Sequence, residues 1–327
     1  MRVIGVDLGG TKAVSARLDD GGLGESILES TQLASSDTLV AQICSLVEQV
    51  RGSEPLDAVG VGVPSVVEFD AGRIVSSVNV PLKDIPLRHV LTERLGVPAF
   101  VDNDATVAAL AEAHDDQLRL VAHDLVMITV GTGVGGGIVI DGRIYRGATG
   151  GAGELGHTLV GLDCAGSIPS PMGFPQPGSL EFVASGHALD RLAEQAANIH
   201  PESELGRLHA EGKEVLGGDA VQAAHDGDPS ALRMVEIWGQ RVGVGVANAI
   251  NTFDPEEVVI GGGAARAGDL LLEPAKKVAR WYVVPGLGTR TTIRLARHGV
   301  RAGVLGAALL AAQELRAPRG RAAEALT

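Results

Sequence analysis

The stretch that decides the fold is Val3-Ile4-Gly5-Val6-Asp7-Leu8-Gly9-Gly10-Thr11-Lys12, close to the amino terminus. Its apolar first half predicts a strand, its glycines predict a tight turn, and Ala13–Leu18 predicts a second strand. In such a turn, glycines let backbone N–H groups converge on phosphate oxygens without interference from a Cβ. Thr11 would add a hydroxyl, Lys12 a positive charge, and Asp7 a carboxylate that holds Mg²⁺ through water. An ordinary β-hairpin turn has the same appearance, so this motif alone leaves both interpretations open.

Two further glycine clusters stand at comparable places in the sequence. Gly131-Thr132-Gly133-Val134-Gly135-Gly136-Gly137 interrupts the apolar stretch Leu125–Ile140, which therefore predicts strand, turn and strand rather than a membrane span. Gly261-Gly262-Gly263 ends the predicted strand Glu257–Ile260. Each cluster alone could be a tight turn. Together they offer the three close backbone approaches that one nucleotide needs, and the two similar hairpins predict a duplicated architecture.

Two short motifs carry side chains suited to hydroxyl chemistry. Asn103-Asp104 stands between the predicted strand Ala99–Val101 and a predicted helix, where a helix cap is the plainer interpretation. The functional interpretation is that Asp104 accepts a hydroxyl proton, because phosphoryl transfer asks more of positioning than of the base. Gly153-Glu154-Leu155-Gly156-His157 places a carboxylate and an imidazole three residues apart, where both could face a polyhydroxylated ligand, although a single His is weak support.

Bulk properties exclude several classes of protein. The 327 residues exceed the usual size of a single core, so two domains are expected. The net charge of −13 argues against nucleic-acid binding. The two cysteines, Cys44 and Cys164, provide no disulfide framework and fit a reducing cytosol. With neither a secretory signal nor a membrane span, we expect a cytoplasmic protein without a membrane partner.

Taken in order, these segments resemble the ROK family of sugar kinases and sugar-responsive repressors, within the actin-like ATPase superfamily. The likeness runs from residue 2 to about residue 315 and includes Gly60-Val61-Gly62-Val63-Pro64 and Asp254-Pro255-Glu256-Glu257. It implies an α/β fold of two actin-like (ribonuclease H-like) lobes with an inter-lobe cleft. The boundaries we expect are 1–120 plus 304–316 for a smaller lobe, 121–303 for a larger lobe, and 317–327 for a disordered tail.

The resemblance also implies roles for individual residues. ATP with Mg²⁺ would be the phosphoryl donor, Asp104 the catalytic base, and the protein a homodimer. The residues implied to contact the nucleotide and its Mg²⁺ are Asp7, Gly9, Gly10, Thr11, Lys12, Thr132, Gly133, Gly261, Gly262 and Gly263. Those implied on the sugar side are Asn79, Asn103, Glu154, His157, Glu181 and Ser65.

The sequence departs from the family pattern on the sugar side. Ser65 stands where a Gly usually follows the Pro, and Asn79-Val80-Pro81-Leu82 is one residue shorter than the family's Asn-Leu-Pro-Gly-Trp and lacks the Trp. The family's three zinc-binding cysteines are missing from Met172–Glu181, where prolines stiffen the loop instead. His157 and Cys164 supply at most two of the four ligands that a structural zinc requires, so we expect no metal there.

A glucokinase-like transfer of the γ-phosphoryl group to the 6-hydroxyl of a hexose is the first choice of function. A kinase of an amino sugar (N-acetylhexosamine or kanosamine) or of a cyclitol is the alternative, followed by a non-catalytic sugar-binding regulator. The family's repressors carry a helix-turn-helix domain before the first phosphate motif, and six residues before Asp7 leave no room for one.

Overall fold

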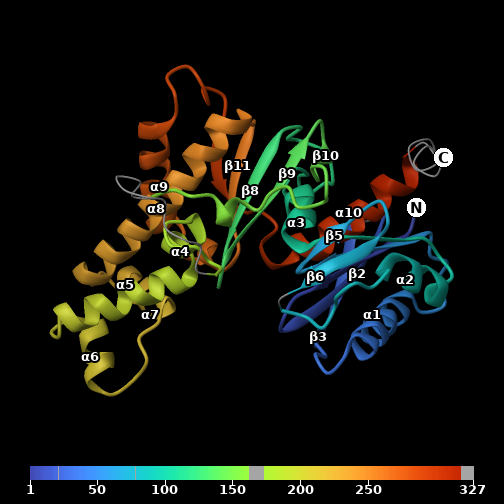
Figure 1. Ribbon diagram of the computed structural model, residues 1–327, viewed down its shortest axis with the longest axis horizontal. Coiled ribbons are helices and arrows are strands. Elements are labelled where there is room, and N and C mark those ends of the chain that lie inside the picture. Colours follow the sequence, from blue (N-terminus) through green and yellow to red (C-terminus); the bar gives the residue numbers. More distant parts are fainter. Residues whose placement is uncertain (21, 78, 162–172, 318–327) are drawn as a thin grey trace. The chain divides into compact units, whose positions relative to one another are not determined.

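The structure is a computed structural model that describes residues 1–20, 22–77, 79–161 and 173–317 (Figure 1). The chain divides into two compact units. The first comprises Met1–Asp124, Gly137–Gly153 and the chain from Val300 onward, and the second comprises Leu125–Gly136 and Glu154–Gly299. The sequence analysis placed residues 121–303 in one lobe, whereas residues 137–153 here group with the first unit. The cause is a close approach at Gly137, where a Cβ would lie 2.7 Å from the carbonyl oxygen of Ala105.

A five-stranded sheet with the order β3-β2-β1-β4-β7 forms the base of the first unit. Its antiparallel part consists of β1 (Val3–Leu8), β2 (Lys12–Asp19) and β3 (Gly22–Ser30). Strands β4 (Ala58–Val63) and β7 (Ala99–Asn103) run parallel to β1. The remaining elements of this unit are the hairpin of β5 (Ser65–Glu68) and β6 (Arg73–Ser77), and the helices α1 (Ser36–Arg51), α2 (Leu87–Leu95), α3 (Asp104–Glu112) and α10 (Ala302–Arg316).

One face of this sheet is covered by apolar side chains. Alternate residues of β1 and β4 point toward α1 and α2, as the period of two along a strand requires. The buried residues on this face include Ile4, Val6, Leu8, Val59, Val61 and Val63, which pack with Leu39, Ile43 and Leu46 of α1.

The opposite face of β1 and β4 is lined by glycine. A Cβ at Gly5 would collide with the carbonyl oxygen of Val304, and one at Gly60 with that of Ala307. Helix α10 therefore rests with its backbone directly on the backbone of the sheet. The alternation Ala58-Val-Gly-Val-Gly-Val63 is the sequence signature of this packing, because it assigns valine to one face and glycine to the other.

A second five-stranded sheet has the order β10-β9-β8-β11-β12, which repeats the order of the first sheet strand for strand. Its strands are β8 (Leu125–Val130), β9 (Val134–Ile140), β10 (Arg143–Ile144), β11 (Glu257–Gly261) and β12 (Thr292–Leu295), with β8, β11 and β12 parallel. The repeated order agrees with the duplicated architecture that the two glycine hairpins predict.

Helices make up most of the second unit (Figure 1). They are α4 (Leu180–Ala184), α5 (Gly186–Ile199), α6 (Glu204–Ala210), α7 (Gly217–His225), α8 (Pro229–Phe253) and α9 (Asp269–Tyr282). The 3₁₀ turns are η1 (Leu155–His157), η2 (Gly263–Ala267) and η3 (Gly299–Arg301), and the boundary between the units falls within η3.

Trp238 of α8 is buried in the core, and its indole N–H donates to the carbonyl oxygen of Ala184 at 2.8 Å. This bond fixes α4 on α8.

The elements expected from the sequence occur with small shifts of their ends. The predicted strand Ala99–Val101 lies within β7, the helix expected after Asn103-Asp104 is α3, and the predicted strand Glu257–Ile260 is β11. Residues 162–172, which include Cys164, and residues 318–327 of the expected tail lie outside the described residues. Within the described chain, no helix has the length and apolar character needed to cross a membrane.

Replacing Gly60 by alanine tests the direct packing of α10 on the sheet. Because the new Cβ would meet backbone rather than a movable side chain, we expect Gly60→Ala to lower the free energy of unfolding of the first unit by about 3 kcal/mol. Urea-induced unfolding followed by circular dichroism measures this change. Gly218→Ala in α7 is the matched control, since its Cβ has no atom within 4 Å. Equal unfolding midpoints for the two variants would refute the packing argument.

Candidate active site

In the first unit, two carboxylates meet where parallel strands end. Asp7 lies near the end of β1 and Asp104 directly follows β7, while Gly62 of β4 lies between these strands. A Cβ at Gly62 would lie 3.4 Å from the Cα of Asp104 and 3.8 Å from Oδ1 of Asp7. A Cβ at Gly303, in the first turn of α10, would collide with the Asp7 carboxylate. The glycine face of the sheet thus holds Asp7 between a helix start and a second carboxylate.

This environment changes the proton affinity of Asp7. Burial is the larger cause and the charge of Asp104 the smaller, and together they raise the pKa of Asp7 to about 7. Desolvation acts in this direction because it disfavours the charged form, and a second negative charge nearby does the same. A divalent cation near Asp7 would oppose both effects, and a carboxylate is one of the ligands that such a cation takes in proteins.

The first glycine turn has the form that the sequence predicts. The N–H of Gly9 donates to the carbonyl oxygen of Lys12 at 2.8 Å, and the hydroxyl of Thr31 donates to the carbonyl oxygen of Gly9 at 2.7 Å. Thr11 and Lys12 are exposed. A Cβ at Gly10 would lie 3.5 Å from Cβ of Asn79, so the structure brings a predicted sugar contact beside the predicted phosphate turn.

Asn103 serves as the N-cap of α3, which is the plainer of its two interpretations, and it also joins the site. Its side-chain oxygen accepts the N–H of Thr106 at 3.1 Å, and its side-chain amide donates to the carbonyl oxygen of Ser65 at 3.4 Å. Asp104 begins the helix, and its Oδ1 accepts the N–H of Ala105 at 2.8 Å. The hydroxyl of Ser65 is buried and has no hydrogen-bond partner in the part of the chain that the structure describes.

In the second unit, the turn at Gly131–Gly133 joins β8 and β9, and Thr132 is exposed at its tip. The N–H of Gly131 donates to the carbonyl oxygen of Gly133 at 2.9 Å. The carboxylate of Glu181 accepts the N–H of Val134 at 2.8 Å, and a Cβ at Gly133 would come within 2.5 Å of it. Glu181 is therefore fixed directly beneath the turn.

The Glu154–His157 segment packs against the same start of β9. A Cβ at Gly156 would collide with the carbonyl oxygen of Val134, whose N–H binds Glu181. Glu154 and His157 are exposed, with Oε2 and Nε2 3.8 Å apart, and the His157 ring meets Phe174 edge to face at 5.1 Å. The structure therefore brings together, around one strand end, the three residues of this unit that the sequence predicts on the sugar side.

The third glycine cluster lies beside the base of the second turn. Gly261 ends β11 and pairs with Thr129 of β8. The backbone at Gly262 has a φ of +78°, and a Cβ added there would lie 2.5 Å from the carbonyl oxygen of Val130. Both the positive φ and the close approach require glycine. Both strands end here, and carboxyl ends of parallel strands are where α/β proteins commonly bind ligands.

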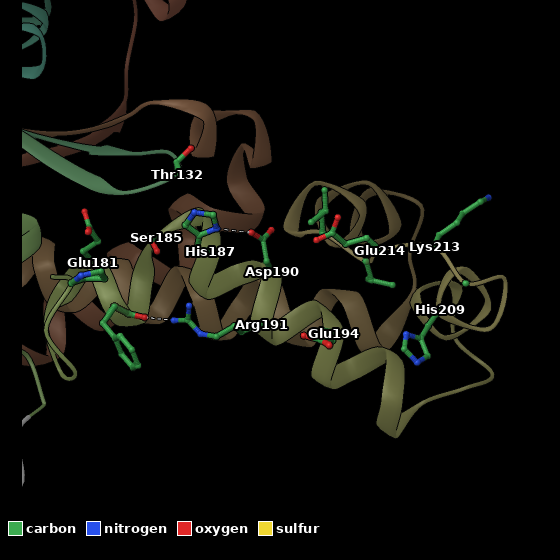
Figure 2. A pocket seen from close by; sticks show the side chains of 15 residues that line it. Thr132, Glu181, Ser185, His187, Asp190, Arg191, Glu194, His209, Lys213 and Glu214 are labelled. Carbon is green, nitrogen blue, oxygen red and sulfur yellow. Dashed lines mark hydrogen bonds and ion pairs between the residues drawn. The ribbon is translucent and has the colours of Figure 1, made fainter. Parts of the chain in front are cut away.

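A cavity of about 920 Å³ opens next to Thr132 and Glu181 and extends along α5 (Figure 2). This volume lies within the range of about 300–1,000 Å³ that is common for ligand sites. Thr132 and Glu181 lie at one end, and His209 and Lys213 at the other. Its lining carries both signs of charge, with Arg191 and Lys213 beside four carboxylates, those of Glu181, Asp190, Glu194 and Glu214.

The part of this cavity that α5 supplies was not predicted from the sequence. His187, Asp190, Arg191 and Glu194 line it, and the side chain of Asp190 accepts the N–H of Gly217 at 2.7 Å. Their spacing of three, four and seven residues forms a polar stripe along one helix face, which is a detectable signal. A polar stripe on a helix usually faces solvent, however, so the pattern alone does not distinguish a cavity wall from a surface.

Known proteins resemble this chain over nearly its whole length. The sequence pattern of the ROK family matches residues 3–314. A glucokinase from Halalkalibacterium halodurans is 35% identical over 325 residues, covering 95% of each chain. A ROK family glucokinase from Streptomyces griseus, solved in complex with glucose and AMPPNP, has a TM-score of 0.78 at 32% identity and covers 96% of this chain and 100% of that one. A ROK family transcriptional regulator, a homologue of the E. coli MLC protein, has a TM-score of 0.81 at 26% identity, covering 96% and 78%.

Two sheets of one strand order, each opening on a glycine hairpin, define a protein with the actin-like ATPase fold. The expectation of this fold class from the sequence is confirmed. Within it, the chain belongs to the ROK family, as its ordered motifs indicated.

The raised pKa of Asp7 predicts a pH-dependent stability. The folded protein holds this proton more tightly than the unfolded chain, so the stabilisation is complete below about pH 4 and is lost as the pH rises through about 7. Asp7→Asn cannot ionise. Its free energy of unfolding relative to the wild type should therefore increase between pH 5 and pH 8 by roughly 2–4 kcal/mol.

Urea titrations without nucleotide or divalent cation measure this difference. Asp104→Asn is the companion variant, because loss of its charge removes the smaller of the two causes and should weaken, but not abolish, the pH dependence. A gap between wild type and Asp7→Asn that stays constant with pH would show that Asp7 titrates normally.

Proposed function

We propose that this protein is an ATP-dependent kinase that transfers the γ-phosphoryl group to a hydroxyl of a hexose, with the 6-hydroxyl of glucose as first choice. The observation that carries the proposal is the Asp7–Asp104 pair at the strand ends of the first unit, in a chain that is similar to glucokinases over 95% of its length. The pair provides a base and an anionic position for a cation, which are the two kinds of group that phosphoryl transfer uses.

Asp104 acts as the base. It accepts the proton of the attacking sugar hydroxyl while the new bond forms between that oxygen and the γ-phosphorus, and the bond from this phosphorus to the oxygen of ADP breaks. No strongly shifted pKa is needed for Asp104, because the hydroxyl loses its proton as the bond forms. Asn103, whose side chain caps α3 and bonds to Ser65, orients the sugar beside it.

Each unit has groups that suit the phosphates of a nucleotide. In the first unit these are the backbone N–H groups of Gly9 and Gly10 and the hydroxyl of Thr11, and in the second unit they are the hydroxyl of Thr132 and the backbone of Gly133. Mg²⁺ supplies charge neutralisation at the phosphates when bound, and Asp7 is the carboxylate of this chain that would hold it, through water.

The sugar-side residues set the choice of substrate. Glu154, His157 and Glu181 offer acceptors to hydroxyl groups, as do Asn79 and Asn103. Ser65, which departs from the family pattern, lies directly beside Asn103. A kinase for an amino sugar, either an N-acetylhexosamine or kanosamine, or for a cyclitol is therefore the alternative within this class. As in the sequence analysis, we assign the protein to the cytoplasm and expect a homodimer.

A sugar-responsive regulator is the second class to weigh, because the fold alone does not separate the two. The TM-score to the ROK regulator, 0.81, is as high as the value of 0.78 to the glucokinase. What favours the kinase is the catalytic set, with Asp104 placed beside Asp7 and both glycine turns formed. A regulator needs to bind the sugar but has no use for a base.

An ADP-release assay tests the proposal. It contains ATP and Mg²⁺, and its panel of acceptors is glucose, N-acetylglucosamine, N-acetylmannosamine, fructose, kanosamine and myo-inositol. We expect turnover of glucose or of one close analogue, and a kcat lowered by about 10²–10⁴-fold in Asp104→Asn, since general base catalysis contributes this much. Asp226→Asn is the matched control, because Asp226 is exposed at the end of α7.

Calorimetric titration with glucose separates the two classes of function. Binding without turnover in the folded wild type would support a regulator instead of a kinase. Full activity in folded Asp104→Asn would remove Asp104 from the mechanism.

A further inference from the structure

A largely buried guanidinium in the first unit, that of Arg146, lies outside the residues assigned so far. Nε of Arg146 donates to Oδ2 of Asp102 at 2.7 Å, and its Nη2 lies 3.5 Å from Oε1 of Glu314 in α10. Its Cζ lies 3.5 Å above the ring of Phe69 in the turn after β5. The side chains of Arg146 and Asp102 are only 19% and 2% exposed, so the pair is shielded from water and salt.

Asp102 connects this guanidinium to the proposed catalytic turn. Its other oxygen, Oδ1, accepts the backbone N–H of Asn103 at 2.9 Å. Asn103 in turn caps α3 and bonds to Ser65. One carboxylate therefore holds Arg146 with one oxygen and the residue before Asp104 with the other. Burial raises the pKa of Asp102 and Arg146 opposes this rise, so removal of Arg146 would leave a buried carboxylate without its cation.

Arg146 also fixes the segment that leads to Glu154. Its carbonyl oxygen accepts the N–H of Ala152 at 3.1 Å. A Cβ at Gly150 would collide with the carbonyl oxygen of Val67, so the loop lies tightly against β5. The loop ends at Gly153, and Glu154 is the next residue. The backbone of Arg146 therefore fixes the loop that ends just before Glu154. Its side chain fixes the turn that carries Asp104, through Asp102.

We propose that Arg146 is a positioning residue for phosphoryl transfer, which sets the Asn103-Asp104 turn through its ion pair with Asp102 and holds the root of the Glu154 loop. This inference rests on the proposed kinase function. Arg146 contacts no reacting atom. Its effect is on the fraction of bound sugar that has its hydroxyl aligned with Asp104, because small displacements of a reacting group are costly in rate.

The geometry argues against a purely stabilising role. Buried ion pairs contribute little net stability compared with apolar groups of similar volume, whereas they are well suited to fixing one arrangement of the groups they touch. Here the guanidinium contacts a strand end, a hairpin turn and a helix at once, and the strand end leads directly into Asn103 and Asp104. Lysine would keep the charge but lose the planar stacking on Phe69 and the fork of donors.

The test compares Arg146→Met with Arg143→Met. Arg143 is the matched control, because it also pairs with Glu314, at 3.7 Å, but its side chain is 52% exposed. With the best substrate of the wild type, we expect Arg146→Met to lower kcat by about 10–100-fold while the KM for ATP changes less than about twofold. Arg143→Met should stay within about twofold of the wild type in both. Arg146→Lys should recover part of kcat.

Hydrogen exchange of the peptide that spans residues 101–106 gives a readout that needs no activity. Faster exchange in Arg146→Met and unchanged exchange in Arg143→Met are expected, because only the first variant releases Asp102. Asp102→Asn serves where Arg146→Met fails to fold, and it should show the same loss of kcat. The double variant Arg146→Met/Asp102→Asn should be no worse than either single one, since the two side chains act as one unit.

A kcat of folded Arg146→Met equal to that of Arg143→Met overturns the inference. A wild type that phosphorylates none of the sugars counts against the proposed function instead, and the exchange rates then decide about Arg146. Exchange that is faster in Arg146→Met than in Arg143→Met would show that Arg146 fixes the Asn103-Asp104 turn. Equal exchange in the two variants would refute this role.

Discussion

The structure of the first unit depends on the contact between the backbone of α10 and the glycine face of β1 and β4. Side chains at Gly5 or Gly60 would keep the helix at the usual distance from the sheet. Without them, the start of α10 reaches the end of β1, where Gly303 lies against the carboxylate of Asp7. The position of Asp7 therefore depends on the absence of side chains at Gly5 and Gly60.

The same packing explains the electrostatics of the site. Parallel strands β1, β4 and β7 end at one edge, so Asp7 and Asp104 are brought together, and the cover supplied by α10 removes water from Asp7. Both consequences raise the proton affinity of the Asp7 carboxylate. A place that is unfavourable for two negative charges would suit the cation of the proposed kinase reaction.

The sequence predicted what local patterns encode. The glycine hairpins, the fold class and most strand and helix positions follow from turn chemistry and from apolar periods, and the order of the motifs adds the family. Arg146 and Asp102 could not be found in this way, because they are 44 residues apart and each is an ordinary charged residue until the fold joins them. The cavity along α5 was missed for a related reason, since a polar stripe marks both surfaces and cavity walls. Residues 137–153 group with the first unit through packing on α3, and no local pattern in the sequence indicates this contact.

The last helix of the chain completes the first unit, and this has a consequence for synthesis on the ribosome. Strands β1 and β4 emerge early, yet the helix that covers their glycine face is translated after residue 300. Most of the second unit, from Glu154 to Gly299, leaves the exit tunnel as one continuous segment before then. Most of the second unit is thus synthesised before the glycine face of the first sheet can be covered, because that face stays open until residues 302–316 have been translated.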